Sequence, residues 1–425
     1  MSNKAQKRGL VPKLRFPAFR DAGEWEADEL GTVAVFVNEK IPVEQVALEN
    51  YVSTENILQD FGGVARASKL PTMGAVTRFR HLDTLVSNIR PYLKKVWVAD
   101  KEGGASNDVI VIRAKQRLLP QYFSFLLKND TFIDYVMTGA KGVKMPRGDI
   151  GSMKAYPALY PTKPEQQKIA DCLASLDERI TLEAQKLDTL KIHKKGLMQQ
   201  IFPAEGETLP KLRFPEFREA GEWVIDPFDQ LVEVIDGDRG INYPSAEEFS
   251  SSGYCLFLNA KNVTKNGFRF EAMQFITKEK DCVLRKGRLN RADVVLTTRG
   301  SVGQFAYFSK EVPFENIRIN SGMVVLRIKT KKVNSDYLSA FCKSERLGAY
   351  IANIAFGNAQ QQLTVAEIKK FQLYYPGPNE QQKIVECLSS LDDLITAQTQ
   401  KLAALKTHKK GLMQQLFPVQ DEVDV

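Results

Sequence analysis

A long segment of this sequence occurs twice, and the repeat limits the folds open to the chain more than any other feature. Glu165–Pro203 and Glu380–Pro418 align without a gap and share EQQKI, HKKGLMQQ and a final FP. In both copies apolar residues recur at alternating spacings of three and four over five heptads, which is typical of coiled-coil helices. The alternative, two amphipathic helices on separate cores, fits less well because the apolar seam is only two positions wide. We therefore predict two long helices that pair with each other.

Polar residues interrupt this seam and indicate how the helices pair. In an antiparallel arrangement within one chain, Glu183 faces Lys409 and Lys194 faces Gln398. Neighbouring registers place some of these groups against leucine, which costs about 1–3 kcal/mol for each unsatisfied group. We therefore predict an antiparallel coiled coil in which these four residues set the register.

A second, shorter repeat opens each half of the chain. Val11–Trp25 and Leu209–Trp223 share the pattern PKLRFPxFRxAGEW. Its prolines exclude a regular helix, so we expect an extended segment that docks on the domain and ends at a tryptophan. The order of short repeat, intervening block and long helix occurs twice, which predicts two half-molecules related by a pseudo-two-fold axis.

The blocks between the repeats have mixed patterns of apolar residues. VIVIRA and VWVAD in the first block, and DVVLTTRG, GQFAYFS and GMVVLRI in the second, are typical of strands, whereas 121–136 and 335–354 have helical spacing. The predicted fold class is α+β: two α/β domains separated by two long helices that form an antiparallel coiled coil, with an internal pseudo-two-fold repeat. The expected domains are 1–163 (short repeat and first block), 164–203 (first helix), 204–377 (connector and second block), 378–418 (second helix) and 419–425 (acidic tail).

Composition excludes several classes of protein. No apolar run among the 425 residues approaches the length of a membrane span, and the first residues lack the apolar region of a signal peptide. We therefore expect a cytoplasmic protein. The five cysteines are scattered, with no CxxC spacing, so the sequence has no pattern for structural zinc or for a disulfide framework.

Positive charge is concentrated in the two blocks. The net charge of the chain is +8, and residues 32–163 and 230–375 carry +6 and +7. The first long helix is balanced, and the connector 202–229 is acidic. Two basic blocks beside neutral helices favour a polyanionic partner such as nucleic acid.

Each block offers an arginine in a turn beside a strand and a later loop rich in hydrogen-bonding side chains. Arginine and lysine suit guanine edges and phosphates, and asparagine and glutamine can form two hydrogen bonds with adenine. Glycines in these loops allow the backbone to approach a groove closely. The candidate DNA-contacting residues are Arg90, Lys94, Lys95, Lys141, Lys144 and Arg147 in the first block, and Arg239, Arg299, Ser301, Gln304, Asn358, Gln360, Gln361 and Gln362 in the second.

Motifs of catalysis are missing from the sequence. It contains no G-x-G-x-x-G, no GxxxxGK[ST], no HExxH and no Asn/Asp-Pro-Pro-Tyr/Phe tetrapeptide. His193 and His408 occupy the same place in the two helix copies, which indicates a role in packing or at the surface. We therefore predict a non-catalytic chain with no catalytic residue, no bound metal and no bound cofactor.

These motifs resemble one family closely, the specificity subunits of Type I restriction–modification systems. The resemblance covers almost the whole chain. It rests on PKLRFPxFRxAGEW in two copies, on EQQKI at the start of each long helix, and on LTTRGSVGQ and INSGMVVLRI in the second block.

The resemblance implies more than the spacing of residues does. It implies two target recognition domains that each read one half of a split sequence in double-stranded DNA. It also implies that the helices set the spacing and dock two modification subunits, which use S-adenosylmethionine to methylate adenine N6. Restriction subunits that use ATP and magnesium for translocation and cleavage then join the complex. Such a complex serves in defence against phage.

Two other functions stay open at this point. A self-sufficient DNA-modifying enzyme would need cofactor and catalytic motifs that the sequence lacks. A coiled-coil adaptor without sequence readout would not need two basic blocks of this size. Methyl transfer by the purified chain alone would favour the enzyme, and loss of DNA binding on mutation of Arg299, with the helix pairing intact, would argue against the adaptor.

Overall fold

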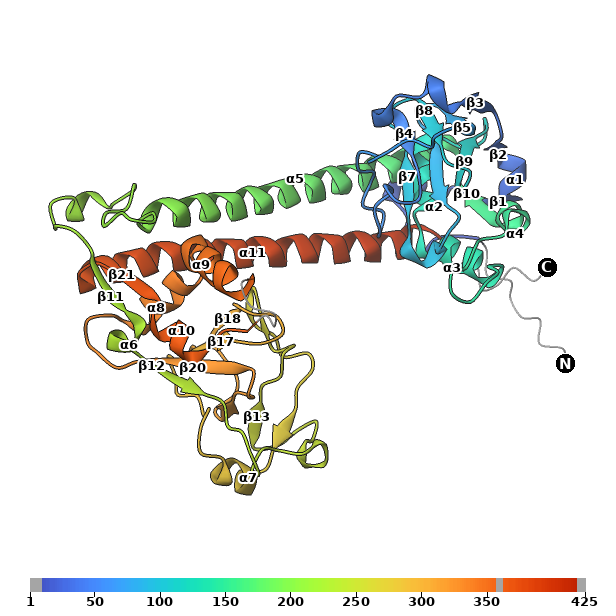
Figure 1. The fold of residues 1–425 in the computed structure, drawn as a ribbon. Coiled ribbons are helices and arrows are strands. Elements are labelled where there is room, and N and C mark those ends of the chain that lie inside the picture. Colours follow the sequence, from blue (N-terminus) through green and yellow to red (C-terminus); the bar gives the residue numbers. More distant parts are fainter. Residues whose placement is uncertain (1–9, 357–361, 419–425) are drawn as a thin grey trace. The chain divides into compact units, whose positions relative to one another are not determined.

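The computed structural model describes residues 10–356 and 362–418, and the chain divides into two compact units (Figure 1). Unit 1 comprises Met1–Gln185 and Gln400–Val425, and unit 2 comprises Lys186–Thr399. The predicted acidic tail 419–425 lies outside the described residues. The two long helices are α5 (Lys163–Ile201) and α11 (Pro378–Leu416). Each unit therefore contains the first part of one long helix and the last part of the other.

Unit 1 is built on two four-stranded sheets. Its strands are β1 (Glu26–Glu29), β2 (Ala34–Val37), β3 (Lys40–Pro42), β4 (Tyr51–Val52), β5 (Ala75–Phe79), β6 (Thr84–Ser87), β7 (Val96–Val98), β8 (Gly103–Ala105), β9 (Val109–Ala114) and β10 (Pro157–Tyr160). Its short helices are η1 (Pro17–Phe19), α1 (Leu30–Val33), η2 (Val43–Gln45), η3 (Leu48–Asn50), η4 (Pro91–Leu93), α2 (Pro120–Leu127), α3 (Asp130–Thr138) and α4 (Ile150–Ala155). The antiparallel sheet has the order β2-β9-β6-β7, and the mixed sheet has the order β3-β5-β8-β4. β1 pairs separately with β10.

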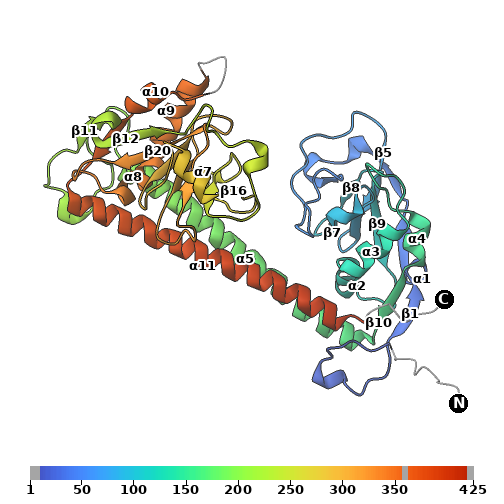
Figure 2. The same cartoon turned by 90° about the horizontal axis from the view of Figure 1, so that it is seen from below.

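Unit 2 repeats the antiparallel sheet with the order β12-β20-β17-β18 and again has a separate pair, β11 with β21. Its strands are β11 (Val224–Pro227), β12 (Val232–Asp236), β13 (Cys255–Phe257), β14 (Val263–Thr264), β15 (Gly267–Phe268), β16 (Phe275–Ile276), β17 (Val294–Thr297), β18 (Phe305–Tyr307), β19 (Ile317–Arg318), β20 (Met323–Ile328) and β21 (Gln372–Tyr375). Its short helices are η5 (Pro215–Phe217), α6 (Phe228–Leu231), η6 (Ala246–Glu248), α7 (Lys278–Val283), α8 (Ser335–Cys342), α9 (Glu345–Phe356) and α10 (Val365–Lys369). The second sheet differs from that of unit 1, with the order β16-β13-β19. Figure 2 shows α8 between the β12-β20 sheet and the first part of α11.

The helical stretches of the two blocks each form two helices. In unit 1 the break falls at Asn129, whose side chain caps α3 by accepting a hydrogen bond from the amide of Thr131. The first helix of each pair carries a buried tyrosine at the same repeat position. The hydroxyl of Tyr122 donates to the carbonyl of Leu159 at 2.8 Å, and that of Tyr337 donates to the carbonyl of Tyr374 at 2.6 Å. The two units therefore share one internal framework.

The short repeat docks on the start of a long helix through a buried ion pair. In unit 1 the Arg15 guanidinium donates two hydrogen bonds to the Glu165 carboxylate, at 2.8 and 2.7 Å, and both side chains are at least 90% buried. In unit 2 Arg213 makes the same pair of bonds to Glu380, both at 2.8 Å. These are the arginine of KLRFP and the glutamate of EQQKI, so one repeat motif binds the other.

The next residue of EQQKI joins the long helix to the α/β domain. The buried Gln166 side chain accepts a hydrogen bond from the amide of Leu119 and donates to the carbonyls of Arg117 and Pro161. Gln381 makes the corresponding three bonds in unit 2. A buried amide that uses its donors and acceptor in this way has few other placements. The angle at which each long helix leaves its domain is thereby fixed.

The tryptophan that ends each short repeat is buried near the end of a long helix: α11 for Trp25 in unit 1 and α5 for Trp223 in unit 2. Trp25 packs edge-on against Tyr122 and Phe417, with ring centroids 6.2 and 6.3 Å away. In unit 2 Trp223 packs against Tyr337, and Phe202 lies 6.0 Å from the same ring. Phe202 and Phe417 belong to the FP that closes each copy of the long repeat. Each domain core therefore holds the start of one long helix and the end of the other.

The long helices run antiparallel in unit 1. Lys401 of α11 forms an ion pair with Glu183 of α5, and Lys409 forms one with Asp177. The residue number on α5 falls as the number on α11 rises, which is the signature of opposite directions. The predicted fold class, two α/β domains with two long helices in an antiparallel coiled coil, is confirmed.

The two seam lysines form ion pairs with residues other than those predicted to face them. Lys409 pairs with Asp177 rather than with Glu183, and Lys194 pairs with Asp392 rather than with Gln398, both at 2.5 Å. The lysines do not need a polar partner in the seam, because their long side chains reach an aspartate beside it.

A second lysine lies beside each of these aspartates. Lys128, at the end of α2, lies near both Asp177 and Lys409. Burial lowers the pKa of Lys128, and the Asp177 carboxylate opposes this shift. Lys343 has the same relation to Asp392 and Lys194 in unit 2. In each unit one aspartate therefore serves two cations.

The Arg15–Glu165 pair predicts a large effect of a single substitution. In Arg15→Ala the Glu165 carboxylate stays buried without its cation, and we expect a loss of about 3–5 kcal/mol in the stability of unit 1. Urea unfolding followed by circular dichroism measures this as a lower midpoint of the unit 1 transition. Arg20→Ala removes an exposed arginine from the same segment and is expected to leave the midpoint unchanged; equal shifts would contradict the assignment.

The register predicts which residues are energetically coupled. A double-mutant cycle between Asp177→Ala and Lys409→Ala is expected to give about 0.5–1 kcal/mol of coupling, because the two side chains form a partly buried ion pair. The same cycle between Glu183→Ala and Lys409→Ala is expected to give none. Coupling in the second cycle alone would restore the register deduced from the sequence.

Candidate nucleic-acid interface

In unit 1 the fold brings the arginine turn and the later basic loop together. Arg90 follows β6 in the left-handed region, with φ of 52°. Its amide donates to the carbonyl of Pro146 at 2.8 Å, and Ile89 forms a bridge with Arg147. Lys141 and Arg147 exchange two backbone hydrogen bonds of 2.9 Å, which close the loop into a hairpin. Segments some 50 residues apart thus form one surface.

The side chains of this hairpin face solvent. Lys141, Lys144 and Arg147 are all exposed. Arg147 contacts Asp108 at 2.8 Å, and Lys141 lies 3.6 Å from Asp149. These exposed pairs contribute little to stability and are easily exchanged for phosphate.

Arg90 itself is half-buried, and its Nε has no hydrogen-bond partner within the part of the chain that the structure describes. A buried N–H without a partner is costly, so an incoming acceptor would satisfy it.

Lys94 and Lys95 are engaged inside the domain instead. The ammonium of Lys94 donates to Asp130 at 2.7 Å, and this hydrogen bond raises the pKa of Lys94. The ammonium of Lys95 donates to the carbonyl of Thr54 at 2.6 Å. The sequence shows their charge but not these partners, which come from distant segments.

In unit 2 the arginine turn borders a cavity of about 270 Å³. The turn after β17 lines one side with Arg299 and Ser301, and the turn before β20 lines the other with Asn320 and Ser321. Backbone pairing again joins the predicted loop to the turn, because Arg299 bridges Gln362 and the amide of Leu363 donates to the carbonyl of Thr298. A concave site with several polar groups suits the edge of a base.

The remaining candidates of unit 2 have different positions. Gln304 is half-buried beside the same turn, where its amide donates to the hydroxyl of Thr297 at 2.9 Å. Arg239 is not among the cavity-lining residues; it donates to Asp236 and to the carbonyl of Ser321, which does line the cavity. Asn358, Gln360 and Gln361 lie outside the described residues.

Sequence reasoning missed two exposed apolar tips in these loops. Val143 and Ile241 are fully exposed, more than any other large apolar side chain in the described ranges. Each follows a basic residue and a glycine with positive φ, +97° at Gly142 and +98° at Gly240. The pattern Lys/Arg-Gly-Val/Ile was visible in the sequence, but exposure was not. Apolar tips of this kind suit contact with a thymine methyl group.

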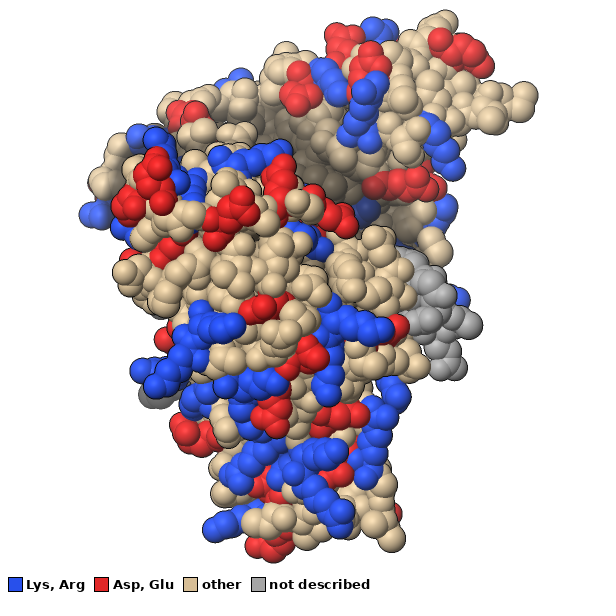
Figure 3. Space-filling view, turned by 60° about the vertical axis from the view of Figure 1, so that its left-hand side comes forward, with Lys and Arg blue, Asp and Glu red and all other residues tan. Residues whose placement is uncertain are grey.

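Asn320 and Ser321 were also missed as site residues, although they stand in the INSGMVV motif. A turn before a strand is a weak signal by itself, and only the fold places it opposite Arg299. Lysine and arginine gather, with acidic residues among them, over the α7 end of unit 2 (Figure 3). The local charge therefore favours a polyanion here.

The described residues offer no metal site or membrane span. No group of three or more histidine, cysteine, aspartate or glutamate side chains in these ranges is placed to hold a metal ion. Among the helices that the structure describes, none is long and apolar enough to cross a membrane. Burial raises the pKa of the Cys255 thiol to about 12, which is opposite to the shift that activates a nucleophile.

Comparison with known proteins gives a consistent result. The profile of the family described as Type I restriction modification DNA specificity domain matches residues 83–191 and 221–407. The MjaVIII specificity subunit of a Type I restriction enzyme from Methanocaldococcus jannaschii is 23% identical over 331 residues, which cover 75% of this chain and 74% of the relative.

Two solved structures share the fold. The S subunit of a Type I restriction–modification system from M. genitalium aligns with a TM-score of 0.58 and 15% identity, over 97% of this chain and 100% of that one. A chain from a structural study of complex assembly and conformational transition in the Type I system aligns with a TM-score of 0.60 and 17% identity, over 93% and 97%.

Proposed function

The chain belongs to the Type I restriction–modification DNA specificity family, and from this we propose that it selects the DNA sequence on which partner subunits act. Each α/β domain reads one half of a bipartite target in double-stranded DNA. The observation that carries this proposal is the pairing of one framework with two unlike loop surfaces. The antiparallel sheet has the same strand order in both units. In unit 1 a basic hairpin faces solvent, whereas in unit 2 a polar cavity stands at the same turn.

The long helices act as a spacer between the two readers. The coiled coil resists bending, and ion pairs such as Lys409–Asp177 oppose sliding of one helix along the other. The distance between half-sites then follows from helix length rather than from the loops.

Two copies of one modification subunit dock on the repeated surfaces. A groove of about 500 Å³ lies between the short repeat and the first turns of α5, lined by Phe16–Phe19, Gln167 and Lys168 among others. Gln167 and Lys168 are exposed, and the matching Gln382 and Lys383 are identical and exposed too. Burial explains identity between the two copies at core positions but not at these exposed ones. A common partner at both sites does explain it.

The chemistry then belongs to the partners. Modification subunits supply S-adenosylmethionine and methylate adenine N6, and restriction subunits use ATP and magnesium for translocation and cleavage. This chain acts without cofactor or catalytic residue, by holding the duplex in register while a partner flips a base.

The reader assignment is tested with one substitution in each unit. Arg90→Ala and Arg299→Ala are each expected to relax selection at one half-site only, by about 1–3 kcal/mol or roughly 5–150-fold in base discrimination. Mapping of methylated adenines in cells that carry the chain and its modification partner measures this. Lys331→Ala, an exposed change at the far end of β20, serves as the control. Relaxed base selection at the same half-site in both variants would contradict the proposal that each domain reads a different half-site.

The docking assignment is tested by stoichiometry. Phe19→Glu and Phe217→Glu place a charge in the short repeat of one unit each, and both phenylalanines are half-buried outside the core clusters. Each single variant is expected to bind one modification subunit instead of two, and the double variant none, when complex mass is measured by light scattering. Met73→Glu, at an exposed site in a different loop, should retain two. Retention of two subunits by the double variant would refute this docking site.

A further inference from the structure

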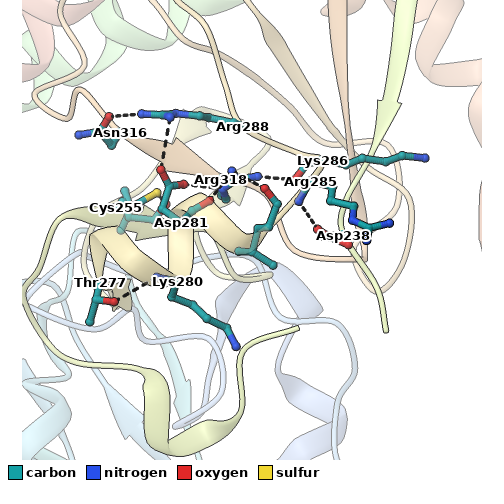
Figure 4. Close-up of polar contacts among 12 residues, drawn as sticks. Asp238, Cys255, Thr277, Lys280, Asp281, Arg285, Lys286, Arg288, Asn316 and Arg318 are labelled. Atoms are coloured by element: carbon teal, nitrogen blue, oxygen red, sulfur yellow. Dashed lines mark hydrogen bonds and ion pairs between the residues drawn. The ribbon is translucent and has the colours of Figure 1, made fainter. Parts of the chain in front are cut away.

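Two loops of unit 2 meet at one aspartate. The carboxylate of Asp238, after β12, accepts a hydrogen bond from the amide of Arg239 at 2.8 Å. It also accepts from the amide of Arg285, after α7, at 2.6 Å and from that of Lys286 (Figure 4). Burial opposes its ionisation, but the amides outweigh burial and lower the pKa of Asp238. A charged carboxylate is therefore fixed among the backbones of three basic residues.

The two loops also touch directly through glycines. A Cβ on Gly287 would lie 3.3 Å from the Cα of Gly237 and 2.8 Å from the Ile319 side chain, and its φ of +82° is strained for other residues. A Cβ on Gly237 would lie 2.1 Å from the carbonyl oxygen of Asn320. Only residues without a side chain allow this approach. The loop 284–288 is thereby held against the β12 loop and β19.

A buried arginine fixes the same loop from the inside. Arg318 is 5% exposed and donates through Nε to the Asp281 carboxylate at 2.5 Å. Its other nitrogens donate to the carbonyls of Asp281, Leu284 and Lys286 at 2.6–2.9 Å. These carbonyls belong to the end of α7 and the residues that follow it. Figure 4 shows the Arg318–Asp281 pair beside the loop, with the Lys286 side chain extending away from that pair.

The outer side of this framework is basic. Arg239, Arg285, Lys286 and Arg288 are all exposed, and we call them the basic ridge. Within the described ranges, no hydrogen bond or ion pair involves the side chain of Arg285 or Lys286. Arg288 donates to Asn316 at 2.7 Å and lies 3.4 Å from Asp281. The Arg285 and Lys286 side chains thus form no ion pair among the residues that the structure describes, while their backbone amides are fixed by Asp238.

The basic ridge lies next to the cavity that Arg299 lines. Arg239 donates to the carbonyl of Ser321, and Ser321 lines the cavity beside Arg299. A duplex that presents base edges to the cavity has its phosphates to either side of the groove. Exposed cations next to a reading site suit those phosphates, which position the protein without reading sequence.

We propose that the basic ridge binds the phosphate backbone of duplex DNA and that Asp238 is a positioning residue that holds the loop 284–288 against it. This rests on the proposed function, because it names the backbone contact of the same DNA surface. An acidic residue in such a surface is explained by its backbone partners: it repels phosphate, yet it anchors the amides of the residues that attract phosphate.

The ridge is tested with a random-sequence DNA duplex, because phosphate contacts do not depend on sequence. Arg285→Ala/Lys286→Ala is expected to weaken binding by the purified chain about tenfold at low salt and to reduce the slope of log K against log salt by about 2, since each phosphate contact contributes about 0.9. Lys331→Ala/Lys370→Ala removes the same charge from exposed sites at the other end of the sheet and should leave the slope nearly unchanged.

The role of Asp238 is tested by whether its replacement strengthens or weakens DNA binding. If the residue acted only through its charge, Asp238→Ala would bind DNA more tightly. If Asp238 anchors the loop 284–288, the Asp238→Ala change frees this loop. We then expect about threefold to tenfold weaker DNA binding, because the loop must be ordered when DNA binds. Asp238→Asn keeps an acceptor oxygen without the charge and is expected to bind at least as well as the parent. Circular dichroism confirms that each variant is folded.

The outcomes separate the inference from the proposed function. Parental affinity and slope in the ridge variant, or tighter binding by Asp238→Ala, would overturn the inference while DNA binding persists. Failure of the parent chain to bind duplex DNA at low salt would overturn the proposed function as well.

Discussion

The buried ion pair between the two repeat motifs is the interaction on which the architecture depends. Arg15 and Glu165 form it in unit 1, and Arg213 and Glu380 form it in unit 2. Each pair sits where the short repeat, the α/β domain and a long helix converge, and the adjacent glutamine completes the junction with three hydrogen bonds. A buried charge that loses its partner is strongly destabilising. The motifs therefore persist in both copies while the blocks between them have diverged.

The antiparallel pairing follows from the same junctions. Each α/β core accepts the first turns of one long helix and the FP end of the other, as Trp25 with Phe417 and Trp223 with Phe202 illustrate. Helices that must begin in one core and end in another run in opposite directions. The seam then needs no specific polar pairs to set direction. Lys194 and Lys409 are free to reach the aspartates beside it, which also neutralise the lysines that end α2 and α8.

How much the sequence could predict depends on how far apart in sequence the interacting residues are. Heptad spacing predicted both long helices, and the repeat predicted two similar domains, because both features lie in consecutive residues. The partners of Lys194 and Lys409 were mispredicted because lysine side chains span more than a turn, so facing positions do not identify partners. Lys94 and Lys95 looked like free charges because their acceptors, Asp130 and Thr54, are distant in sequence. Asp238 gave no signal, since three amides define its role.

The loops of the two candidate DNA surfaces are held mainly by backbone hydrogen bonds, and this explains how one framework can carry unlike loop surfaces. In unit 1 the turn after β6 pairs with the basic hairpin through Ile89 and Arg147, and in unit 2 the turn after β17 pairs with the later loop through Arg299 and Gln362. Backbone bonds of this kind do not depend on side-chain identity. Side chains at these positions can therefore change without moving the loops, as the difference between the two units illustrates. Arg285 of the basic ridge is likewise held through its backbone amide, which leaves its side chain exposed to solvent.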